Sequence, residues 1–436
     1  MEQARMIPPA NANESNDPFA VRRLGECKYL SPLPEGFFVD ERRRVLLDPE
    51  LSADGTPVSD VTLEPAGPHR RLFFDPAVAH AAIVTCGGLC PGLNDVIRAV
   101  TMVLWYRYGV RNILGIRYGY AGMVPGTHNP PVPLDPETVE DIHQNGGTIL
   151  GSSRGEQDAD AMLDFLLAHG INMLFTIGGD GTQRGALAID RAAQRRGNSL
   201  AVVGIPKTID NDISFTDRTF GFETAVEMSR HPIRCAHMEA KGAEDGIGLV
   251  KLMGRESGFV AAYAALASSD VNLVLIPEAP FSINRVLSWL EDRLTRKSHA
   301  VIVVAEGAGQ HLVRDSGKDA SGNAKFGDVG LYLKDRIQAH FSPPLMPVSV
   351  KYIDPSYTIR SAPANADDSV FCFDLGERAV HAALAGRTGL VVAHWSGRFV
   401  LVPMEQAVSK RKMIDTSGAL WQSVLDNTGQ PAQLSD

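Results

Sequence analysis

The residues with the clearest chemical capacity begin with an aspartate inside a glycine-rich turn. Residues 178–182 read Gly-Gly-Asp-Gly-Thr and follow an apolar run. Glycines between a strand and a helix let the backbone approach a phosphate, and the helix N-terminus supplies N–H donors. Asp180 does not suit anion binding by itself, but it suits a magnesium ion that bridges phosphates. The alternative is a tight turn in which Asp180 only caps the helix.

A pair of carboxylates follows a second apolar run. Residues 207–212 read Lys-Thr-Ile-Asp-Asn-Asp, which places Asp210 and Asp212 two residues apart. One carboxylate can accept the proton of a hydroxyl nucleophile while the other orients it or assists a metal. The alternative is an Asx-turn with solvated charges.

Further polar groups have the chemistry to bind anions. Residues 86–94 form a second glycine loop whose backbone could hold a nucleotide phosphate. Arg154 ends a run of small residues, where a guanidinium could stabilise charge on a phosphoryl group in transfer. Arg255 and Arg360 each follow an apolar stretch, and arginine is the usual partner of a sugar phosphate. For each single arginine, a surface salt bridge is the alternative.

One basic cluster is expected to have no role in the site. Lys410, Arg411 and Lys412 are consecutive, and we interpret them as a solvated positive face.

Short apolar runs predict the elements that position these residues. Near-continuous apolar runs, mostly rich in β-branched residues, are typical of parallel strands buried on both faces. Helical patterns lie between them, as at residues 184–196, so the chain is expected to form α/β layers. Polar residues gather directly after the strands, at the sheet edge where ligands bind. The six predicted strands are 81–84, 173–177, 201–205, 247–250, 273–276 and 301–304.

Composition limits the function classes. The chain of 436 residues has a net charge of -9, which disfavours nonspecific nucleic-acid binding. Five cysteines thinly spread over this length suit a reducing compartment, and no apolar run is long enough to span a bilayer. The first residues lack the apolar core of a signal peptide, so a cytoplasmic location is expected.

Taken together and in this order, the motifs resemble those of the 6-phosphofructokinase family over residues 80 to about 430. The resemblance is greatest to the ATP-dependent branch of plants and trypanosomes, on residues 87–95, 206–212 and 351–357.

The resemblance implies an α/β fold of two lobes, each a mainly parallel sheet flanked by helices, with the site between them. The nucleotide-binding lobe would be residues 76–222, completed by about 361–400. The sugar-phosphate lobe would be 223–360, completed by about 401–436. Residues 1–75 would be an N-terminal extension, which its composition suggests is partly ordered at best.

The resemblance also implies roles. Asp210 would be the general base for the 1-hydroxyl of fructose 6-phosphate, aided by Arg154 and Asp212, and Asp180 would hold Mg²⁺. Contacts with ATP are implied for Gly87, Gly88, Arg154, Gly155, Gly179, Asp180, Gly181 and Thr182. Contacts with the sugar phosphate are implied for Thr208, Ile209, Asp210, Met253, Gly254, Arg255, Glu278, Lys351, Tyr357, Thr358, Ile359 and Arg360.

Bacterial members carry two arginines that reach into a neighbouring subunit, at the positions of Gly246 and Lys351 here. They also carry two effector-binding arginines, where this chain has Arg98 and Met102, which disfavours a bacterial-style allosteric site. A homo-oligomer, dimer or tetramer, is still expected.

The phosphoryl donor depends on two positions. An aspartate replaces Gly181 in most pyrophosphate-dependent relatives, so Gly181 favours ATP; Lys207 points the other way. The alternatives are therefore a pyrophosphate-dependent enzyme, a lipid or NAD kinase with the same glycine turn, and an inactive regulatory subunit. Asp180, Asp210 and Arg154 are all present, which disfavours the last.

Overall fold

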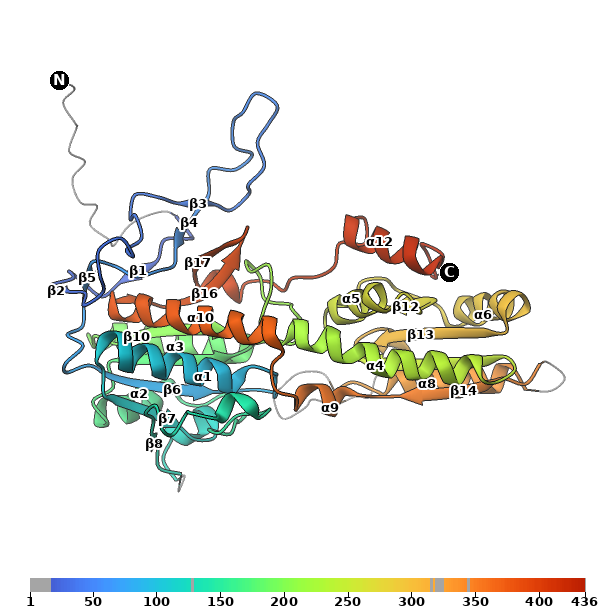
Figure 1. Ribbon diagram of the computed structural model, residues 1–436, viewed down its shortest axis with the longest axis horizontal. Coiled ribbons are helices and arrows are strands. Elements are labelled where there is room, and N and C mark those ends of the chain that lie inside the picture. The colour runs from blue at the N-terminus through green and yellow to red at the C-terminus, as the bar shows by residue number, and fades with distance from the viewer. Residues whose placement is uncertain (1–16, 127–128, 314–316, 318–324, 343–345, 436) are drawn as a thin grey trace.

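Two sheets lie along the long axis of the molecule (Figure 1). The computed structural model describes residues 17–126, 129–313, 317, 325–342 and 346–435. All six predicted strands and the helix predicted over 184–196 are present, which confirms the α/β class.

The larger sheet has nine strands and a parallel centre. Its order is β3 (Val45–Leu46), β4 (Thr62–Pro65), β17 (Arg398–Pro403), β16 (Leu390–Trp395), β10 (Ala201–Pro206), β9 (Met173–Gly178), β6 (His80–Thr85), β7 (Asn112–Ile116) and β8 (Val132–Pro133). Strands β16 to β7 are parallel, and the outer pairings are antiparallel.

Helices cover both faces of this sheet because successive strand residues point to opposite sides. In β6, Ile83 joins one core cluster and Val84 joins another. The helices and short helical turns around the sheet are α1 (Leu93–Met102), η1 (Val103–Tyr108), η2 (Gly119–Met123), η3 (Ile142–Gln144), α2 (Ala159–Ala168), α3 (Asp180–Arg195), α10 (Ala366–Leu384) and α11 (Met404–Ala407). Residues of α1 and α10 pack on the first face, and residues of α2 and α3 pack on the second.

The smaller sheet has four parallel strands. Its order is β12 (Leu273–Leu275), β13 (His299–Ala305), β11 (Gly246–Leu252) and β14 (Ser349–Ile353). The surrounding helices are α4 (Phe222–Lys241), α5 (Phe259–Ser268), α6 (Ile283–Lys297), α7 (Gln310–Val313), α8 (Val329–His340), α9 (Ser356–Arg360) and α12 (Ala419–Thr428).

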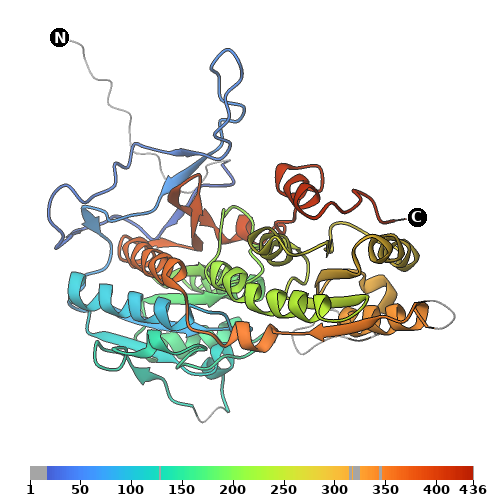
Figure 2. The same ribbon diagram turned by 45° about the vertical axis from the view of Figure 1, so that its right-hand side comes forward.

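One apolar core runs through both halves of the molecule. It includes Ile83 of β6 and Phe371 of α10 in one half, and Val250 of β11 and Val303 of β13 in the other. Helix α4 contacts both α10 and β11, and Figure 2 shows it continuing from the larger half into the smaller one.

The chain passes between the halves before α4, before α10 and after α11 (Figure 1). The expected division near residue 400 falls inside β17, which pairs with β16 of the larger sheet.

The described part of the N-terminal extension, residues 17–75, forms short strands that pair with other segments, so this part is more ordered than its composition indicated. β1 (Arg22–Arg23) pairs with β15 (Arg387–Thr388), and β2 (Tyr29–Leu30) pairs with β5 (Arg71–Leu72). Glu64 of β4 accepts a hydrogen bond from the buried Arg387 (Nε–Oε1 3.1 Å). The extension is therefore ordered by partners that lie far away in the sequence.

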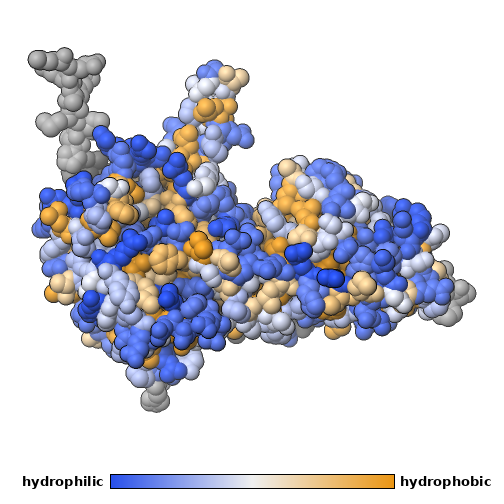
Figure 3. Space-filling view, viewed as in Figure 1, coloured by the Kyte–Doolittle hydropathy of each residue, from blue (hydrophilic) through white to orange (hydrophobic). Residues whose placement is uncertain are grey.

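The segment between β3 and β4 protrudes, with Leu51 and Val58 exposed (Figure 3).

Candidate active site

The predicted general base lies where loops from the two sheets meet. Asp210 follows β10 of the larger sheet, and residues 253–258 follow β11 of the smaller one. The backbone N–H of Arg255 donates to Oδ2 of Asp210 at 3.4 Å, and the hydroxyl of Ser257 donates to its carbonyl oxygen at 3.1 Å. The loop that carries Asp210 follows a strand of the larger sheet, but these two contacts fix it to the half of the molecule that contains the smaller sheet.

The environment of Asp210 suits a proton acceptor. Burial, followed by the negative charges of Asp212 and Glu306, raises the pKa of Asp210 above its ordinary value. Its Oδ1 is buried and has no hydrogen-bond partner among the described residues. A buried acceptor is normally satisfied, so the free Oδ1 is suited to a hydroxyl of a ligand.

Asp212 and Asp180 lie side by side across one guanidinium. Thr208 donates its hydroxyl proton to Oδ1 of Asp212 at 2.7 Å. Arg411 donates from Nη1 to Oδ2 of Asp212 at 3.1 Å, and its Nε lies 3.3 Å from Oδ2 of Asp180. Burial and, to a smaller extent, Asp212 raise the pKa of Asp180, while Arg411 lowers it.

The prediction that the basic run 410–412 is a solvated face is therefore wrong for Lys412 and for the ion pairs of Arg411, whereas Lys410 is exposed as expected. Lys412 is half-buried, and burial lowers its pKa to about 8. Its ammonium donates to Oδ1 of Asn211 at 3.1 Å and to the carbonyl oxygens of Thr216 and Asp217, both at 2.9 Å. Nothing local in the sequence indicates these contacts, because their partners lie about two hundred residues earlier.

The two glycine loops of the larger sheet are joined by a buried lysine. The ammonium of Lys207 donates to the carbonyl oxygen of Gly88 at 2.7 Å. A β-carbon on Gly87, whose φ is +85°, would lie 3.3 Å from this ammonium, and one on Gly88 would lie 3.3 Å from Nη2 of Arg154. The positive φ of Gly87 favours glycine, and a β-carbon at either position would crowd the side-chain ends of Lys207 and Arg154.

The second glycine loop opens helix α3. A β-carbon on Gly178 would collide with Thr182, whereas one on Gly181 would have no atom within 4 Å. Gly179 is the N-cap of the helix, and Asp180 stands in its first turn. The N–H groups at this helix start and the open space at Gly181 suit a phosphate chain.

A second group of charged residues surrounds Asp210 from the side of the smaller sheet. Glu306 follows β13; burial raises its pKa, and the nearby Arg255 and Arg360 lower it. Nε of Arg360 is buried and has no hydrogen-bond partner among the described residues. Its guanidinium also lies 5.2 Å from the ring centre of Tyr357, which is largely exposed. Two arginines in such a group can bind a phosphate.

Helix α9, which carries Arg360, is connected to β11 by a partly buried ion pair. Nζ of Lys251 lies 2.9 Å from Oδ2 of Asp354 and donates to Oδ2 of Asp328 at 2.8 Å. Asp354 in turn accepts a hydrogen bond of 3.1 Å from the N–H of Ser356, the first residue of the helix. Lys251 therefore contributes, through Asp354, to the position of the helix that carries Arg360.

Other predicted residues have mixed placements. Ile209, Met253 and Ile359 are buried core residues, and Gly254 has a φ of +127° that suits glycine. Arg154, Gly155 and Thr358 are exposed. Lys351 is exposed on β14, an edge strand, and no described contact joins it to Asp210.

Glu278 and Glu306 differ in their surroundings. Oε1 of Glu278 accepts the N–H of Gly258 at 3.0 Å and that of Ile414 at 2.9 Å, so this oxygen connects two backbone segments. Its Oε2 is buried and has no hydrogen-bond partner among the described residues, so the predicted contact of Glu278 with the sugar phosphate stays a prediction. Glu306, which was not predicted, stands in the charged group near Asp210 instead. The signal was present, because Glu306 also directly follows an apolar strand.

The residues fit magnesium rather than a closed protein cage. Among the described residues, no cluster of three or more His, Cys, Asp or Glu could hold a metal ion. Mg²⁺ usually takes one or two carboxylates together with substrate phosphates and water. Asp180, a hard oxygen ligand at the helix start beside the open space of Gly181, matches that donor set.

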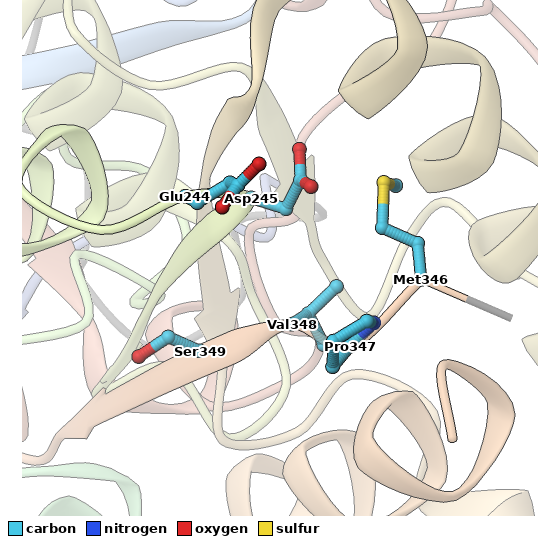
Figure 4. A pocket seen from close by; sticks show the side chains of 6 residues that line it. All are labelled: Glu244, Asp245, Met346, Pro347, Val348 and Ser349. Carbon is cyan, nitrogen blue, oxygen red and sulfur yellow. The ribbon is translucent and has the colours of Figure 1, made fainter. Parts of the chain in front are cut away.

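A separate hollow of about 390 Å³ lies on the smaller half, lined by Glu244, Asp245, Met346, Pro347, Val348 and Ser349 (Figure 4). These residues precede β11 and β14 or, in the case of Ser349, begin β14, so the hollow lies at the strand ends opposite to those followed by Arg255 and Arg360. None of the described helices is both long and apolar enough to cross a membrane.

Comparison with known proteins agrees with this geometry. A protein from Borreliella burgdorferi named ATP-dependent 6-phosphofructokinase is 48% identical, over 97% of this chain and 99% of its own. A protein of the same name from Trypanosoma brucei brucei is also 48% identical, over 87% of this chain and 79% of its own. A solved structure from Marinobacter aquaeolei, titled as a pyrophosphate-dependent phosphofructokinase, shares the fold with a TM-score of 0.66. Its sequence identity is 20%, and the match covers 82% of this chain and 92% of the other.

The family description "Phosphofructokinase" matches residues 80–383, which is more than half of the chain. The resemblance inferred from the motifs is confirmed: the chain belongs to the phosphofructokinase family.

Proposed function

We propose that this chain is an ATP-dependent 6-phosphofructokinase, which transfers the γ-phosphoryl group of ATP to the 1-hydroxyl of fructose 6-phosphate. The observation that carries the proposal is the buried Oδ1 of Asp210, which has no hydrogen-bond partner among the described residues. Asp210 lies between the half of the molecule with the glycine loops and the half with Arg255 and Arg360. The names of relatives at 48% identity over nearly the whole chain support the same reaction.

In the proposed reaction, Asp210 accepts the proton of the sugar hydroxyl through Oδ1. The oxygen of that hydroxyl then forms a bond to the terminal phosphorus, the bond to the bridging oxygen breaks, and ADP leaves. Because burial and two neighbouring carboxylates raise its pKa, Asp210 is a stronger base than an ordinary aspartate. The other carboxylate oxygen is held by the N–H of Arg255, which fixes the direction from which the proton is taken.

The donor phosphates would lie along the two glycine loops and the start of α3. Lys207 and Arg154 approach Gly87 and Gly88 closely enough to contact those phosphates. Asp180 would hold Mg²⁺, which would neutralise part of the negative charge of the donor phosphates. The open space at Gly181 supports ATP over pyrophosphate, since an α-phosphate needs room there.

The 6-phosphate of the sugar would be bound by Arg255 and Arg360, with Glu306 beside them. We assign Glu306 to the sugar hydroxyls and not to the phosphate, because a carboxylate accepts hydrogen bonds from hydroxyl groups and repels a phosphate. We also propose a cytoplasmic homo-oligomer in which the exposed Lys351 on edge strand β14 contacts a second copy of the chain.

The test is an assay of the purified protein with fructose 6-phosphate and Mg²⁺, first with ATP and then with pyrophosphate. The proposal expects fructose 1,6-bisphosphate from ATP with kcat/KM at least about tenfold above that with pyrophosphate, or roughly 1.4 kcal/mol of transition-state preference. A preference for pyrophosphate of that size would overturn the assignment of the donor, and no product with either donor would overturn the activity.

A further inference from the structure

A segment near the C-terminus, which we call the C-terminal strap (residues 408–414), crosses the site between α11 and α12. The carbonyl oxygen of Val408 accepts a hydrogen bond from Nη2 of Arg184 on α3 (2.9 Å). The carbonyl oxygen of Lys410 accepts one from the hydroxyl of Ser214, also at 2.9 Å. The N–H of Ile414 donates to Glu278, the carboxylate that also receives the N–H of Gly258.

The strap also runs beside the loop that carries the catalytic carboxylates. Arg411 forms an antiparallel bridge with Ile213, and the N–H of Lys412 donates to the carbonyl oxygen of Asp212 at 2.9 Å. The ammonium of Lys412 holds the same loop at Asn211, whose φ of +54° is a left-handed conformation that few side chains adopt. The backbone on both sides of Arg411 is therefore fixed.

From this fixed position, Arg411 pairs with two carboxylates, one from the loop after β10 and one from the start of α3. Its Nη1 donates to Asp212 at 3.1 Å and its Nε lies 3.3 Å from Asp180, which stands in the first turn of α3. The carboxylate side chains are 11% and 17% exposed, whereas that of Arg411 is 36% exposed. The two carboxylates thus lie deeper than the guanidinium that connects them.

A guanidinium suits this task because its donors form a rigid planar fork. Through Asp212, the fork is connected to Thr208, whose hydroxyl also accepts the N–H of Asp210 at 3.2 Å. A chain of short contacts therefore runs from the proposed metal ligand Asp180 to the proposed base Asp210.

We propose that Arg411 is a positioning residue for phosphoryl transfer, which fixes Asp180 on the donor side relative to Asp212 on the side of the base. The inference rests on the proposed function. It adds the C-terminal strap to the reaction site, whose other residues precede residue 361. Because in-line transfer depends on alignment, a small displacement of these loops should slow the chemical step more than it weakens binding of either substrate.

The experiment compares Arg411→Ala and Arg411→Lys with the unchanged protein. We would measure kcat, KM for fructose 6-phosphate, KM for ATP and the melting temperature, each with and without millimolar guanidinium chloride. Arg191→Ala is the matched control, since Arg191 is a half-exposed arginine on α3 that pairs with Glu405 on the surface.

For Arg411→Ala we expect kcat to fall by about 10- to 100-fold, the range that a misalignment near 1 Å can produce. KM for fructose 6-phosphate should stay within about threefold, because its arginines are not touched. Added guanidinium ion should restore part of kcat and saturate, and it should not affect Arg191→Ala. Arg411→Lys keeps the charge but lacks the fork, so it should remain well below the unchanged enzyme.

A kcat within twofold of normal in Arg411→Ala would overturn the proposal, and so would full activity in Arg411→Lys. A loss that guanidinium does not reverse, with a lower melting temperature, would reduce Arg411 to a structural residue and overturn it too. If Arg411→Ala does not fold, Arg411→Lys gives the decision. An unchanged enzyme that is inactive with ATP and fructose 6-phosphate would instead reject the proposed function.

Discussion

The backbone N–H of Arg255 donates to the carboxylate of Asp210 at 3.4 Å, so a residue after a strand of the smaller sheet orients the proposed base of the larger one. Because this contact uses only Oδ2, Oδ1 remains available to a substrate hydroxyl. The position of the base therefore depends on the relative placement of the two halves.

Replacing Asp210 by Asn should remove the proton acceptor while keeping the shape of the side chain. We expect kcat to fall by about 10²-fold or more, the contribution usual for a general base. Binding of fructose 6-phosphate should persist, because its phosphate is assigned to Arg255 and Arg360. Steady-state kinetics with a direct binding measurement would check this, and near-normal kcat would remove Asp210 from the mechanism.

The pH dependence should reflect the raised pKa of Asp210. A base acts when deprotonated, and a raised pKa keeps it protonated to a higher pH. Hence kcat/KM should decline on acidification from a pH well above the ordinary value for aspartate, about 3.9.

Glu306→Gln offers the control for this prediction. Glu306 is one of the charges that raise the pKa of Asp210, so its neutralisation should move the acid limb of the profile to lower pH. An acid limb that stays in place, or moves to higher pH, would contradict the assignment.

Arg360→Ala should mainly weaken binding of the sugar phosphate. A hydrogen bond to a charged group contributes about 1.5–3 kcal/mol, so KM should rise by roughly 10- to 100-fold. Arg234→Ala, at an exposed position of α4, should leave KM unchanged. Efficient phosphorylation of fructose without its phosphate by the unchanged enzyme would exclude this role for Arg360.

Gly181→Asp should impair ATP use while sparing the sugar phosphate. The space beside Gly181 is open, so the fold should tolerate the side chain, and an acidic residue suits the first turn of a helix. The new negative charge should repel the donor phosphates and raise KM for ATP. Gly181→Ala adds volume without charge and should have a much smaller effect; equal losses in the two variants would indicate sterics alone.

Arg387→Leu should destabilise the protein through the N-terminal extension. Arg387 is 2% exposed and pairs with Glu64, and removing one partner of a buried pair costs about 3–5 kcal/mol. Denaturant unfolding would measure the loss. The double variant Arg387→Leu with Glu64→Leu leaves no unpaired charge in this pair and should recover part of it; no recovery would argue against the pair as the cause.

Local sequence patterns predicted the buried central strands well, because each is a continuous apolar run followed by polar residues. They failed where a contact joins distant segments. β4 is only four residues long and is ordered by β17, and Arg411 acquires its place only when the strap lies against Asp212. Glu278 and Glu306 both follow apolar strands. Only the three-dimensional arrangement shows that Glu278 accepts two backbone N–H groups and that Glu306 lies in the charged group near Asp210.

The pairing of β4 with β17 has a consequence for the synthesis of the protein. Pro65 and Val400 are register partners, although they lie near opposite ends of the chain. A ribosome makes the N-terminal strands first, yet their partner strand emerges only when translation is almost complete. The pairing of β4 with β17 must therefore form late, and until then β4 has only β3 as its partner in the larger sheet.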